Sequence, residues 1–449
     1  MVWLMALLAA CTWSPTPEVK APEVRQPAHK GARPPDVADP AKLAAPKPAH
    51  AAAATWPDVI VVTLDTTRAD HLGTYGYFRD TSPTIDAFAK TGIVFERMIV
   101  PMATTLPTHT SLFTGVYPIE HGITANVQHG GKQLIPTESL IPLAMWLSDA
   151  GYQTAGFTTA APLNPTTGIE RGFQVFTAPH GELRPGRDAV DDALGWLATT
   201  ATDAPILLWV HLYDPHNPYD PDETYRKQFL DDSPNGGALD QWIDARQITK
   251  LTHRPTGEAV RARPTINNYD AEIRTMDDQI ARLLAALGAR GRLDGSLVIM
   301  MGDHGEGLNQ HGEPGHGLVW QEQLHAPLIL KAPGAAPRRV PGTISAIDVL
   351  PTALGLVELP DEARIRSQMT GVDVLADGFT TRPVFSQSSG RQVTLGKAQA
   401  WTLTDDHSSC RWTEGGDVVT WDLDADPYEL APVIRAIEPH LPLGTSAQS

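Results

Sequence analysis

The run Asp58–Leu64, DVIVVTL, constrains the fold more than any other stretch of the 449-residue chain. It is mostly apolar and rich in β-branched residues, a pattern typical of a strand buried inside a parallel sheet. Asp65 follows it directly, and open α/β sheets place their ligand-binding residues at the carboxyl ends of strands. The sequence therefore predicts a parallel sheet whose functional edge begins at Asp65.

Helix-like and strand-like patterns alternate through the following three hundred or so residues. We predict helices over Pro83–Thr91, Glu138–Ala150, Asp188–Ala198 and Asn267–Gly291, and strands over Gln153–Thr159, Ile206–Leu212, Ser296–Met301 and Ala326–Lys331. This alternation predicts an α/β fold, with a mainly parallel central sheet and helices on both of its faces. Residues 213–265 have few apolar runs and several prolines, which predicts a lid or rim beside a pocket.

The pattern changes after about residue 375. Short alternating segments follow, and they predict antiparallel strands over Val393–Leu403 and Asp417–Leu423 and a final helix over Pro427–His440. We therefore expect a catalytic domain over residues 57–374 and a small C-terminal α+β subdomain with an antiparallel sheet over 375–449.

The N-terminal residues resemble a bacterial lipoprotein signal. Met1–Ala10 is apolar but too short to span a bilayer, and Leu8-Ala9-Ala10-Cys11 resembles a lipobox, which predicts lipidation of Cys11. Residues 12–56 are rich in proline and alanine and predict an extended, disordered tether. We expect a lipoprotein anchored at the periplasmic face of the cell envelope, or a secreted protein, with membrane contact only through the lipid.

The overall charge and the cysteine count exclude several classes of partner and site. Acidic residues outnumber basic ones by 52 to 35, which gives a formal net charge of −17. This balance disfavours a nucleic acid as partner and is compatible with carboxylates that collect metal cations. The chain has only two cysteines, Cys11 and Cys410, so neither a disulfide framework nor a zinc–cysteine site is expected.

The stretch Pro101–Pro118, PMATTLPTHTSLFTGVYP, places a hydroxyl at the start of a predicted helix. Pro107 suits a first helical turn and Gly115 a C-terminal stop, so Thr105 falls at or just before the helix N-terminus. Free amide groups and the positive end of the helix dipole favour an anion there. Thr105 is thus either a nucleophile beside an anion site or simply an N-cap.

Metal-type ligands follow two of the predicted strands. Asp65 ends the first strand, and Gly302-Asp303-His304-Gly305-Glu306 follows Ser296–Met301. Hard divalent cations prefer carboxylate oxygens, and a neighbouring imidazole can join them. An acidic residue after a strand is often only a turn residue, but two such sites together with Thr105 favour a metal centre.

Histidines gather in the same loops. His211 and His216 follow the strand Ile206–Leu212 or end it, and His311 and His316 lie in a Gly/Pro-rich loop. Imidazoles in such positions suit hydrogen-bond donors to an anionic ester and an acid for its leaving group.

Together these motifs resemble the sulfatase family of the alkaline phosphatase superfamily. The matching segments occur in the family's order: Asp65-Thr-Thr-Arg-Ala-Asp-His-Leu-Gly73, the Thr105 loop, His211…Asp214-Pro-His216-x-Pro-Tyr219, Gly302–Glu306, Asp348-Val-Leu-Pro-Thr352 and Thr420-Trp-Asp-Leu-x-x-Asp-Pro-Tyr-Glu429. The resemblance implies an alkaline phosphatase-like fold and hydrolysis of an anionic ester, namely a sulfated or phosphorylated small molecule, glycan or lipid.

The resemblance also implies roles for individual residues. Asp65, Asp303 and His304 would be metal ligands, and Thr105 would be the nucleophile, itself touching the metal. Of the remaining candidates, His109 stands where the family usually has an arginine, His211 and His216 would line the ester pocket, and His316 falls near the family's pocket lysine. The family favours Ca²⁺, while Mg²⁺, Mn²⁺ and Zn²⁺ stay possible because Thr66 replaces a second acid.

Thr105 departs from the family pattern in a way that changes the expected chemistry. Sulfatases have Cys or Ser-x-Pro-x-Arg, whose first residue is oxidised to formylglycine, whereas this chain has Thr105-Leu-Pro-Thr-His109. The β-carbon of threonine carries a methyl group and cannot become an aldehyde, so no formylglycine is expected. Thr105 would instead attack directly as a metal-activated alkoxide and form an ester that water then cleaves.

Three functions stay open at this point. The first is a metal-dependent hydrolase of sulfate or phosphate esters; family membership favours sulfate and the threonine favours phosphate. The second is a transferase that moves a phospho-substituent onto an envelope glycan or lipid. The third is an inactive relative that binds a metal and an anion without turnover.

Overall fold

The computed structural model describes residues 56–179, 184–201, 204–230, 237–248, 250–252, 259–414, 416 and 418–433. They lie in one compact unit, Ala53–Ile434. Three predictions fall wholly or partly outside the described residues. They are the lipidation of Cys11, the tether as far as residue 55, and residues 434–440 of the predicted last helix.

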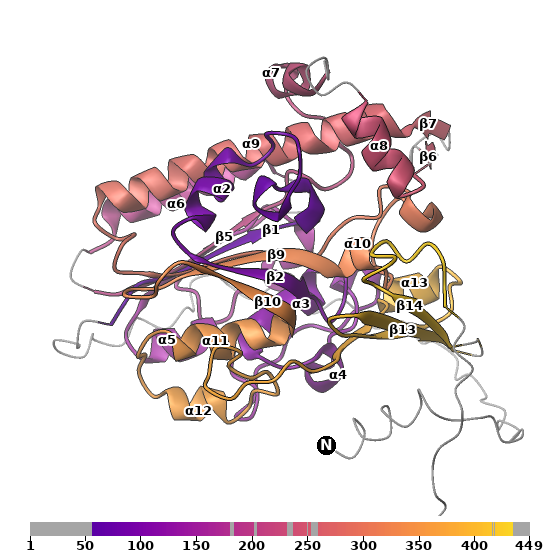
Figure 1. The fold of residues 1–449 in the computed structure, drawn as a ribbon. Coiled ribbons are helices and arrows are strands. Elements are labelled where there is room, and N and C mark those ends of the chain that lie inside the picture. Colours follow the sequence, from indigo (N-terminus) through magenta and orange to yellow (C-terminus); the bar gives the residue numbers. More distant parts are fainter. Residues whose placement is uncertain are drawn as a thin grey trace, which may run out of the picture. The chain divides into compact units, whose positions relative to one another are not determined.

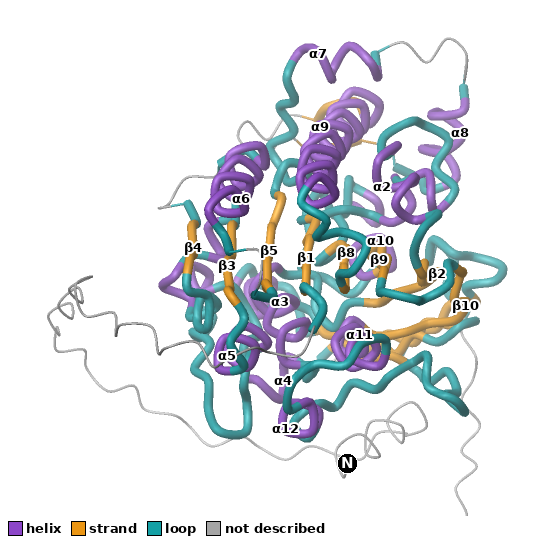
Figure 2. Tube along the Cα trace, turned by 90° about the vertical axis from the view of Figure 1, so that its left-hand side faces the viewer, coloured by secondary structure: helices purple, strands orange, loops and turns teal. Residues whose placement is uncertain are grey.

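An eight-stranded sheet forms the centre of this unit, and Figure 2 shows its strands in a row. Their spatial order is β10-β2-β9-β8-β1-β5-β3-β4. The strands are β1 (Val59–Leu64), β2 (Ile93–Ile99), β3 (Gln153–Phe157), β4 (Val175–Thr177), β5 (Ile206–Leu212), β8 (Leu297–Gly302), β9 (His325–Lys331) and β10 (Arg338–Ser345). Only β9 runs antiparallel to its neighbours, β2 and β8, so the prediction of a mainly parallel sheet is confirmed.

Side chains alternate along the central strands between two hydrophobic cores, because successive residues of a strand point to opposite faces. On β1, Val59 and Val61 belong to one core, whereas Ile60, Val62 and Leu64 belong to the other. Burial on both faces explains why this strand is a continuous apolar run rather than an alternating one.

Helices cover both faces of the sheet (Figure 1). On one face lie α2 (Pro83–Ala89), α6 (Gly186–Thr199) and α9 (Ala262–Ala289), which pack on the core that contains Ile60. The other face carries α3 (Thr105–Thr114), α5 (Leu143–Asp149) and α11 (Val349–Gly355), which pack on the core that contains Val59. Shorter helices connect these layers: α4 (Pro118–His121), α7 (Glu223–Arg226), α8 (Ala238–Ala245), α10 (Gln321–Leu324), α12 (Glu362–Arg366) and α13 (Gly390–Thr394). The predicted α/β class with helices on both faces is confirmed.

A separate four-stranded antiparallel sheet follows the main sheet in the chain. It consists of β11 (Val384–Gln387), β12 (Ala400–Thr404), β13 (Ser408–Thr413) and β14 (Val419–Asp422), in that order. This confirms the prediction of a C-terminal antiparallel sheet. Cys410 lies half-buried on β13.

Several predicted elements differ from the observed ones. The predicted helix Glu138–Ala150 begins only at Leu143, because Pro142 and the residue before it disfavour helical continuation. The predicted strand Val393–Leu403 is wrong over its first part, where α13 ends and a turn follows before β12 begins at Ala400. Residues 427–433 form turns and a bridge between Thr420 and Val433 instead of the start of a helix.

The segment 213–265 carries more structure than the sequence predicts. It contains α7, α8 and a two-stranded hairpin of β6 (Lys250–Thr252) and β7 (Ala259–Arg261). Both α7 and α8 contact α9, so these parts of the segment pack against the long helix. Among the described helices, none has the length and apolar character needed to cross a membrane.

Candidate active site

The pairing of the three central strands brings the predicted site residues together. In β1, Leu64 pairs with Leu212 of β5 and with Gly302 of β8, so the three strands end side by side. The next residues continue the pairing: Asp65 N donates to Leu212 O at 2.9 Å, and Asp303 N donates to Leu64 O at 3.1 Å. Strand register, rather than sequence proximity, therefore places the two carboxylates next to each other.

Asp65, Asp303 and His304 form a compact group of ligand-type atoms. One ligand atom of each lies within 4.8 Å of the others, and the three side chains are at most 1% exposed. Both oxygens of Asp65, Oδ2 of Asp303 and Nε2 of His304 are buried and make no hydrogen bond. Because buried polar atoms without partners are rare and costly, this group fits a cation that all of them would ligate.

The electrostatics of the group point the same way. Burial raises the pKa of Asp65 well above its usual value, and the neighbouring Thr105 hydroxyl partly opposes this shift. Burial and the charge of Asp65 also raise the pKa of Asp303. Two buried carboxylates repel each other when ionised, and a divalent cation between them would remove that repulsion.

Burial, followed by the charges of neighbouring histidines, lowers the pKa of His304 well below its usual value. Its imidazole is therefore neutral near pH 7, as a metal ligand has to be. Its Nδ1 lies 2.9 Å from the carbonyl oxygen of Gly305 and is assigned as the protonated nitrogen, which leaves the lone pair of Nε2 directed into the site.

Thr105 is the first residue of α3 and only 1% exposed, which confirms its predicted place at the helix start. Thr104, the N-cap residue, makes no side-chain cap; instead Oδ1 of Asn126 accepts a hydrogen bond from Leu106 N at 2.9 Å. The helix ends at Gly115, whose φ of 72° is the left-handed conformation that glycine adopts without strain.

His109 is fixed by hydrogen bonds through both ring nitrogens. The indole N–H of Trp209 donates to the Thr63 hydroxyl at 2.9 Å. The Thr63 hydroxyl is therefore assigned as the donor to His109 Nε2, which lies 3.0 Å away. The Nδ1–H of His109 then donates to Thr105 O at 2.8 Å. Asp303 Oδ2 lies farther away, 3.8 Å from the same nitrogen, so His109 orients the helix turn that carries Thr105.

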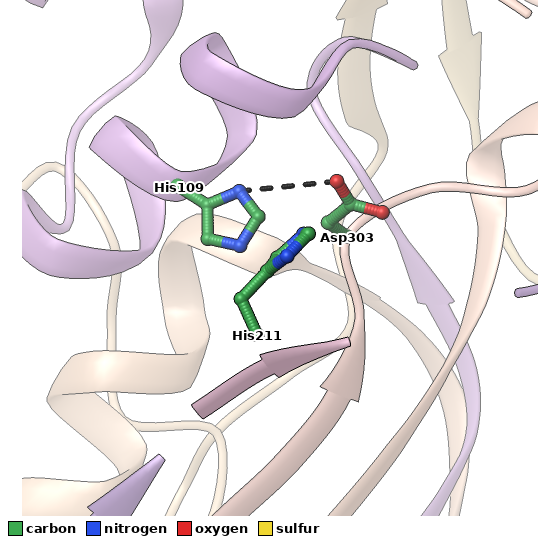
Figure 3. Close-up of side chains that lie close together, drawn as sticks. All are labelled: His109, His211 and Asp303. Carbon is green, nitrogen blue, oxygen red and sulfur yellow. Dashed lines mark ion pairs between the residues drawn. The ribbon is translucent and has the colours of Figure 1, made fainter. Parts of the chain in front are cut away.

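His211 is the last residue but one of β5. Its Nε2 is 3.2 Å from Asp65 Oδ2 but lacks hydrogen-bond geometry, and burial lowers its pKa to about 3. The imidazole is therefore neutral. His211 also groups with His109 and Asp303 as a second possible set of metal ligands, with atoms within 4.8 Å (Figure 3).

His216 and His316 are half-buried and form the accessible side of the site. Their Nε2 atoms lie 3.3 Å apart, and the ring of His316 is 4.2 Å from that of His304 between centroids. Nδ1 of His316 lies 3.0 Å from Ala103 O, two residues before Thr105. These eight candidate site residues therefore belong to one continuous cluster. The fourth histidine of the predicted loops, His311, instead contacts Glu322 and the carbonyl of Glu429.

The sequence did not single out several residues that support this cluster. Thr63 and Asn126 hold His109 and the start of α3, and Gln392 Nε2 donates to His316 O at 2.7 Å. No local pattern marks these residues, since their roles depend on contacts across the fold. Thr66 has a φ of 47°, which is strained for a β-branched residue, and its buried hydroxyl has no partner.

A doubly wound sheet thus carries a buried carboxylate–imidazole cluster beside a hydroxyl at a helix N-terminus. The family model "Sulfatase" matches residues 57–359, and the chain belongs to that family.

Relatives and solved structures agree with this family. The ulvan-active sulfatase of Formosa agariphila is 26% identical over 345 residues, which cover 68% of this chain but only 63%, less than two thirds, of that relative. The Bacteroides fragilis protein YidJ, named as a candidate sulfatase, superimposes with a TM-score of 0.70 at 19% identity, over 85% of this chain and 92% of the other. The phosphonate monoester hydrolase of Agrobacterium radiobacter gives 0.65 at 19% identity, over 84% and 91%. These structures share the fold of this chain.

Proposed function

We propose that this protein is a metal-dependent hydrolase of sulfate or phosphate esters in which Thr105 is the covalent nucleophile. The observation that carries the proposal is the group of buried, unpartnered ligand atoms of Asp65, Asp303 and His304 beside the Thr105 hydroxyl. A purely structural role would leave these atoms paired with one another or with the backbone.

Asp65, Asp303 and His304 would hold the cation, with the Thr105 oxygen beside it. A divalent cation bound there would lower the pKa of the Thr105 hydroxyl and offset the negative charge of the ester. Carboxylates suit Ca²⁺, Mg²⁺ or Mn²⁺, whereas imidazole suits Zn²⁺, so this ligand set is compatible with any of them.

Thr105 Oγ would attack the phosphorus or sulfur atom of the ester, and the bond from that atom to the alcohol oxygen would break. His109 holds the carbonyl of Thr105 and so fixes the first turn of α3 in the direction of attack. Water would then cleave the ester of Thr105 at the same phosphorus or sulfur atom and regenerate the hydroxyl.

The departing alcohol oxygen needs a proton, and the pair His216–His316 is the accessible source. Because their Nε2 atoms are 3.3 Å apart, one proton can be shared between them and delivered to the leaving group. Both side chains are half-buried, whereas the metal-type ligands are closed off, so the ester enters from this side.

The choice between sulfate and phosphate depends on Thr105. Family membership favours sulfate esters, since the relatives include proteins named as sulfatases, such as the ulvan-active sulfatase. However, threonine has no route to formylglycine, so a threonine sulfate would have to be cleaved by water at sulfur. The corresponding phosphate intermediate turns over more readily, which favours phosphate esters.

The test is a substrate screen with the full chain. The purified protein is loaded separately with Ca²⁺, Mg²⁺, Mn²⁺ or Zn²⁺ and assayed on nitrophenyl sulfate, nitrophenyl phosphate and a nitrophenyl phosphodiester. We expect metal-dependent hydrolysis that Thr105→Ala removes. Hydrolysis with no metal ion, or hydrolysis that survives Thr105→Ala, contradicts the mechanism. If added acceptor alcohols change the product ratio, the protein is a transferase.

The lipobox-like Leu8–Cys11 and the proline-rich segment after it support a further proposal about location. We propose that Cys11 carries a lipid and that the tether holds the catalytic domain at the cell envelope, where it meets sulfated or phosphorylated glycans or lipids. Labelling of the protein with a radioactive or clickable fatty acid tests this, and Cys11→Ala should abolish the label.

A further inference from the structure

A cavity of about 590 Å³ lies beside the accessible histidine pair. His216 lines it together with residues from the loop after β5, the start of α6, the region of α7 and one face of α9. In Figure 1, α6 and α9 lie side by side on the same face of the sheet, and their packing is direct. The cavity therefore begins at the residue that would release the alcohol portion of the ester.

Two acidic side chains that are largely buried, Asp214 and Glu272, line this cavity. Glu272 is 8% exposed, and its Oε1 accepts one hydrogen bond, from Asp220 N at 3.0 Å. Asp214 Oδ1 accepts from Gly186 N at 3.1 Å, while Asp214 Oδ2 is buried and has no hydrogen-bond partner. In the described ranges of the chain, neither carboxylate forms an ion pair, although both line the same cavity.

Of the other charged groups that line the cavity, Arg184, Arg187 and Asp220 are paired, whereas Asp222 is exposed and forms no ion pair within the described residues. Arg184 binds Asp192 at 2.9 Å and also donates to Thr158 O and Thr177 Oγ1. Arg187 contacts Asp188, and Asp220 binds Arg226 at 2.7 Å. The charge left for a ligand is therefore negative and comes from Asp214, Asp222 and Glu272.

Gly186 keeps the Asp214 carboxylate close to the start of α6. A Cβ at this position would lie 2.2 Å from Asp214 Oδ2, so any side chain would displace the carboxylate. Tyr213, which stacks on His216 with ring centroids 4.2 Å apart, and Tyr225 add aromatic surface to the same lining. Carboxylates next to aromatic rings are the surroundings in which proteins bind ammonium groups.

We propose that this cavity binds the alcohol portion of the ester and selects alcohols that carry a positively charged ammonium group. The inference rests on the proposed ester hydrolysis, because it assigns the cavity to the leaving group of that reaction. The ammonium group would lie between Asp214 and Glu272, with its alkyl substituents on the tyrosine rings and its ester oxygen near His216.

The pKa values of the two acids are compatible with a cationic ligand. Burial raises the pKa of Asp214 to about 6. Burial, together with the charge of Asp214, raises the pKa of Glu272 to about 8. Both carboxyl groups are thus held partly protonated near neutral pH until a positive charge enters between them.

Binding of choline and of its uncharged isostere 3,3-dimethyl-1-butanol to the full chain, measured by titration calorimetry, tests the proposal. The two molecules differ only in the charge of the quaternary centre. We expect choline to bind at least about tenfold more tightly, a difference of ~1.4 kcal/mol. Equal affinities, or no choline binding by the unmodified protein, overturn the proposal.

Two variants connect this affinity to the cavity. Glu272→Gln keeps the shape of the side chain and removes its charge, and Asp214→Asn does the same for the second acid. Each should weaken choline binding at least about fivefold, whereas the control Asp191→Asn, an exposed acid on α6 paired with Arg282, should bind choline as the unmodified protein does. If both cavity variants bind choline as tightly as the unmodified protein does, the proposal is overturned. Because choline and its isostere are also compared on the unmodified protein, a variant that fails to fold does not decide the result.

Hydrolysis assays separate this inference from the proposed function. Choline phosphate and 3,3-dimethylbutyl phosphate, and the two matching sulfates, are compared as substrates. A kcat/KM ratio that favours the choline ester at least about tenfold, and that falls in Glu272→Gln, supports the inference. Hydrolysis of both esters at equal kcat/KM overturns the inference but leaves the hydrolase function standing, whereas choline binding without any ester hydrolysis contradicts the function and not the cavity.

Discussion

Nε2 of His216 lies 3.3 Å from Nε2 of His316, so the two imidazoles face each other across the accessible side of the site. A hydrogen bond between these nitrogens requires a proton on one of them and a lone pair on the other. One proton can therefore be shared between the two nitrogens.

The first prediction concerns this pair. His316→Gln should lower kcat/KM for alkyl esters by a factor on the order of 10² or more, because a poor leaving group needs protonation. Nitrophenyl esters should lose about tenfold or less, since nitrophenolate leaves without a proton. The measurement is the slope of log(kcat/KM) against the pKa of the leaving group, which should be steeper for His316→Gln than for the unmodified protein. The control is His407→Gln, which changes an exposed histidine paired with Asp424. Equal losses on both ester types in His316→Gln would show that His316 is not the acid.

The second prediction concerns Thr105. Thr105→Ala should lower kcat by a factor on the order of 10³ or more, and Thr105→Ser should keep most of the activity because it keeps the nucleophilic oxygen. Thr110→Ala on the same helix removes a buried hydroxyl that donates to Leu106 O at 2.8 Å and should reduce stability by about 1 kcal/mol without abolishing hydrolysis. Quenched-flow trapping followed by mass spectrometry should find a phosphate or sulfate on Thr105; a modification on another residue would reassign the nucleophile.

A third expected result is loss of metal from ligand variants. Asp65→Asn and Asp303→Asn should each lower the metal content of the purified protein at least about tenfold, because both remove a charged ligand from a buried group. Elemental analysis after dialysis measures the content. Asp294→Asn, an exposed acid paired with Lys331, should bind as much metal as the unmodified protein. Equal metal content in all variants places the metal elsewhere.

The fourth prediction separates orientation from direct catalysis at His109. Thr63→Val removes the hydroxyl that both Trp209 and His109 contact, which leaves two buried nitrogens without a partner and should cost about 1–3 kcal/mol of stability. If His109 only orients the turn that carries Thr105, this variant should lower kcat several-fold with KM and the pH profile unchanged. A shifted pH profile would instead show that His109 titrates during the reaction.

The fifth prediction uses the contact of Glu429, which follows β14, with the segment before β9 that contains His311 and Gln321. The backbone carbonyl of Glu429 lies 3.1 Å from His311 Nε2, and its Oε2 accepts from Gln321 N at 3.0 Å. Burial raises the pKa of Glu429 to about 7, although a hydrogen bond from Ser409 opposes this. Burial would lower the pKa of His311, but the hydrogen bond to Glu322 and its charge outweigh burial and raise it.

Both shifts act in the same direction on stability. A folded pKa above the unfolded one gives stability that is fully present below the unfolded pKa and is lost as the pH rises through the folded value. Protection of β13 and β14 from hydrogen exchange should therefore fall as the pH rises from about 4.5 through about 7, and His311 adds to the fall above about 6.5. Glu429→Gln should make this fall smaller, because the glutamine does not ionise; an unchanged pH dependence in the variant would mean that another group is responsible.

The sequence alone determined the fold class and most of the site. Apolar runs such as Asp58–Leu64 predict buried strands because only a sheet covered on both faces removes both sides of a strand from water. Local chemistry also identified Thr105 at a helix start and the acids after two strands. Such patterns have a limit at Pro142: the periodicity predicts a helix from Glu138, whereas the observed helix begins only after the proline.

Only the tertiary structure decided which of these residues meet. The register of β1 with β5 and β8 sets Asp65 beside Asp303, across a separation of more than two hundred residues, and no local signal encodes that register. The same holds for Thr63, which fixes His109, and for Glu272, whose charge faces a cavity only because α9 packs beside α6. Residue types and strand periods depend on neighbours in the chain, whereas burial, unpaired charge and the distance between ligands depend on neighbours in space.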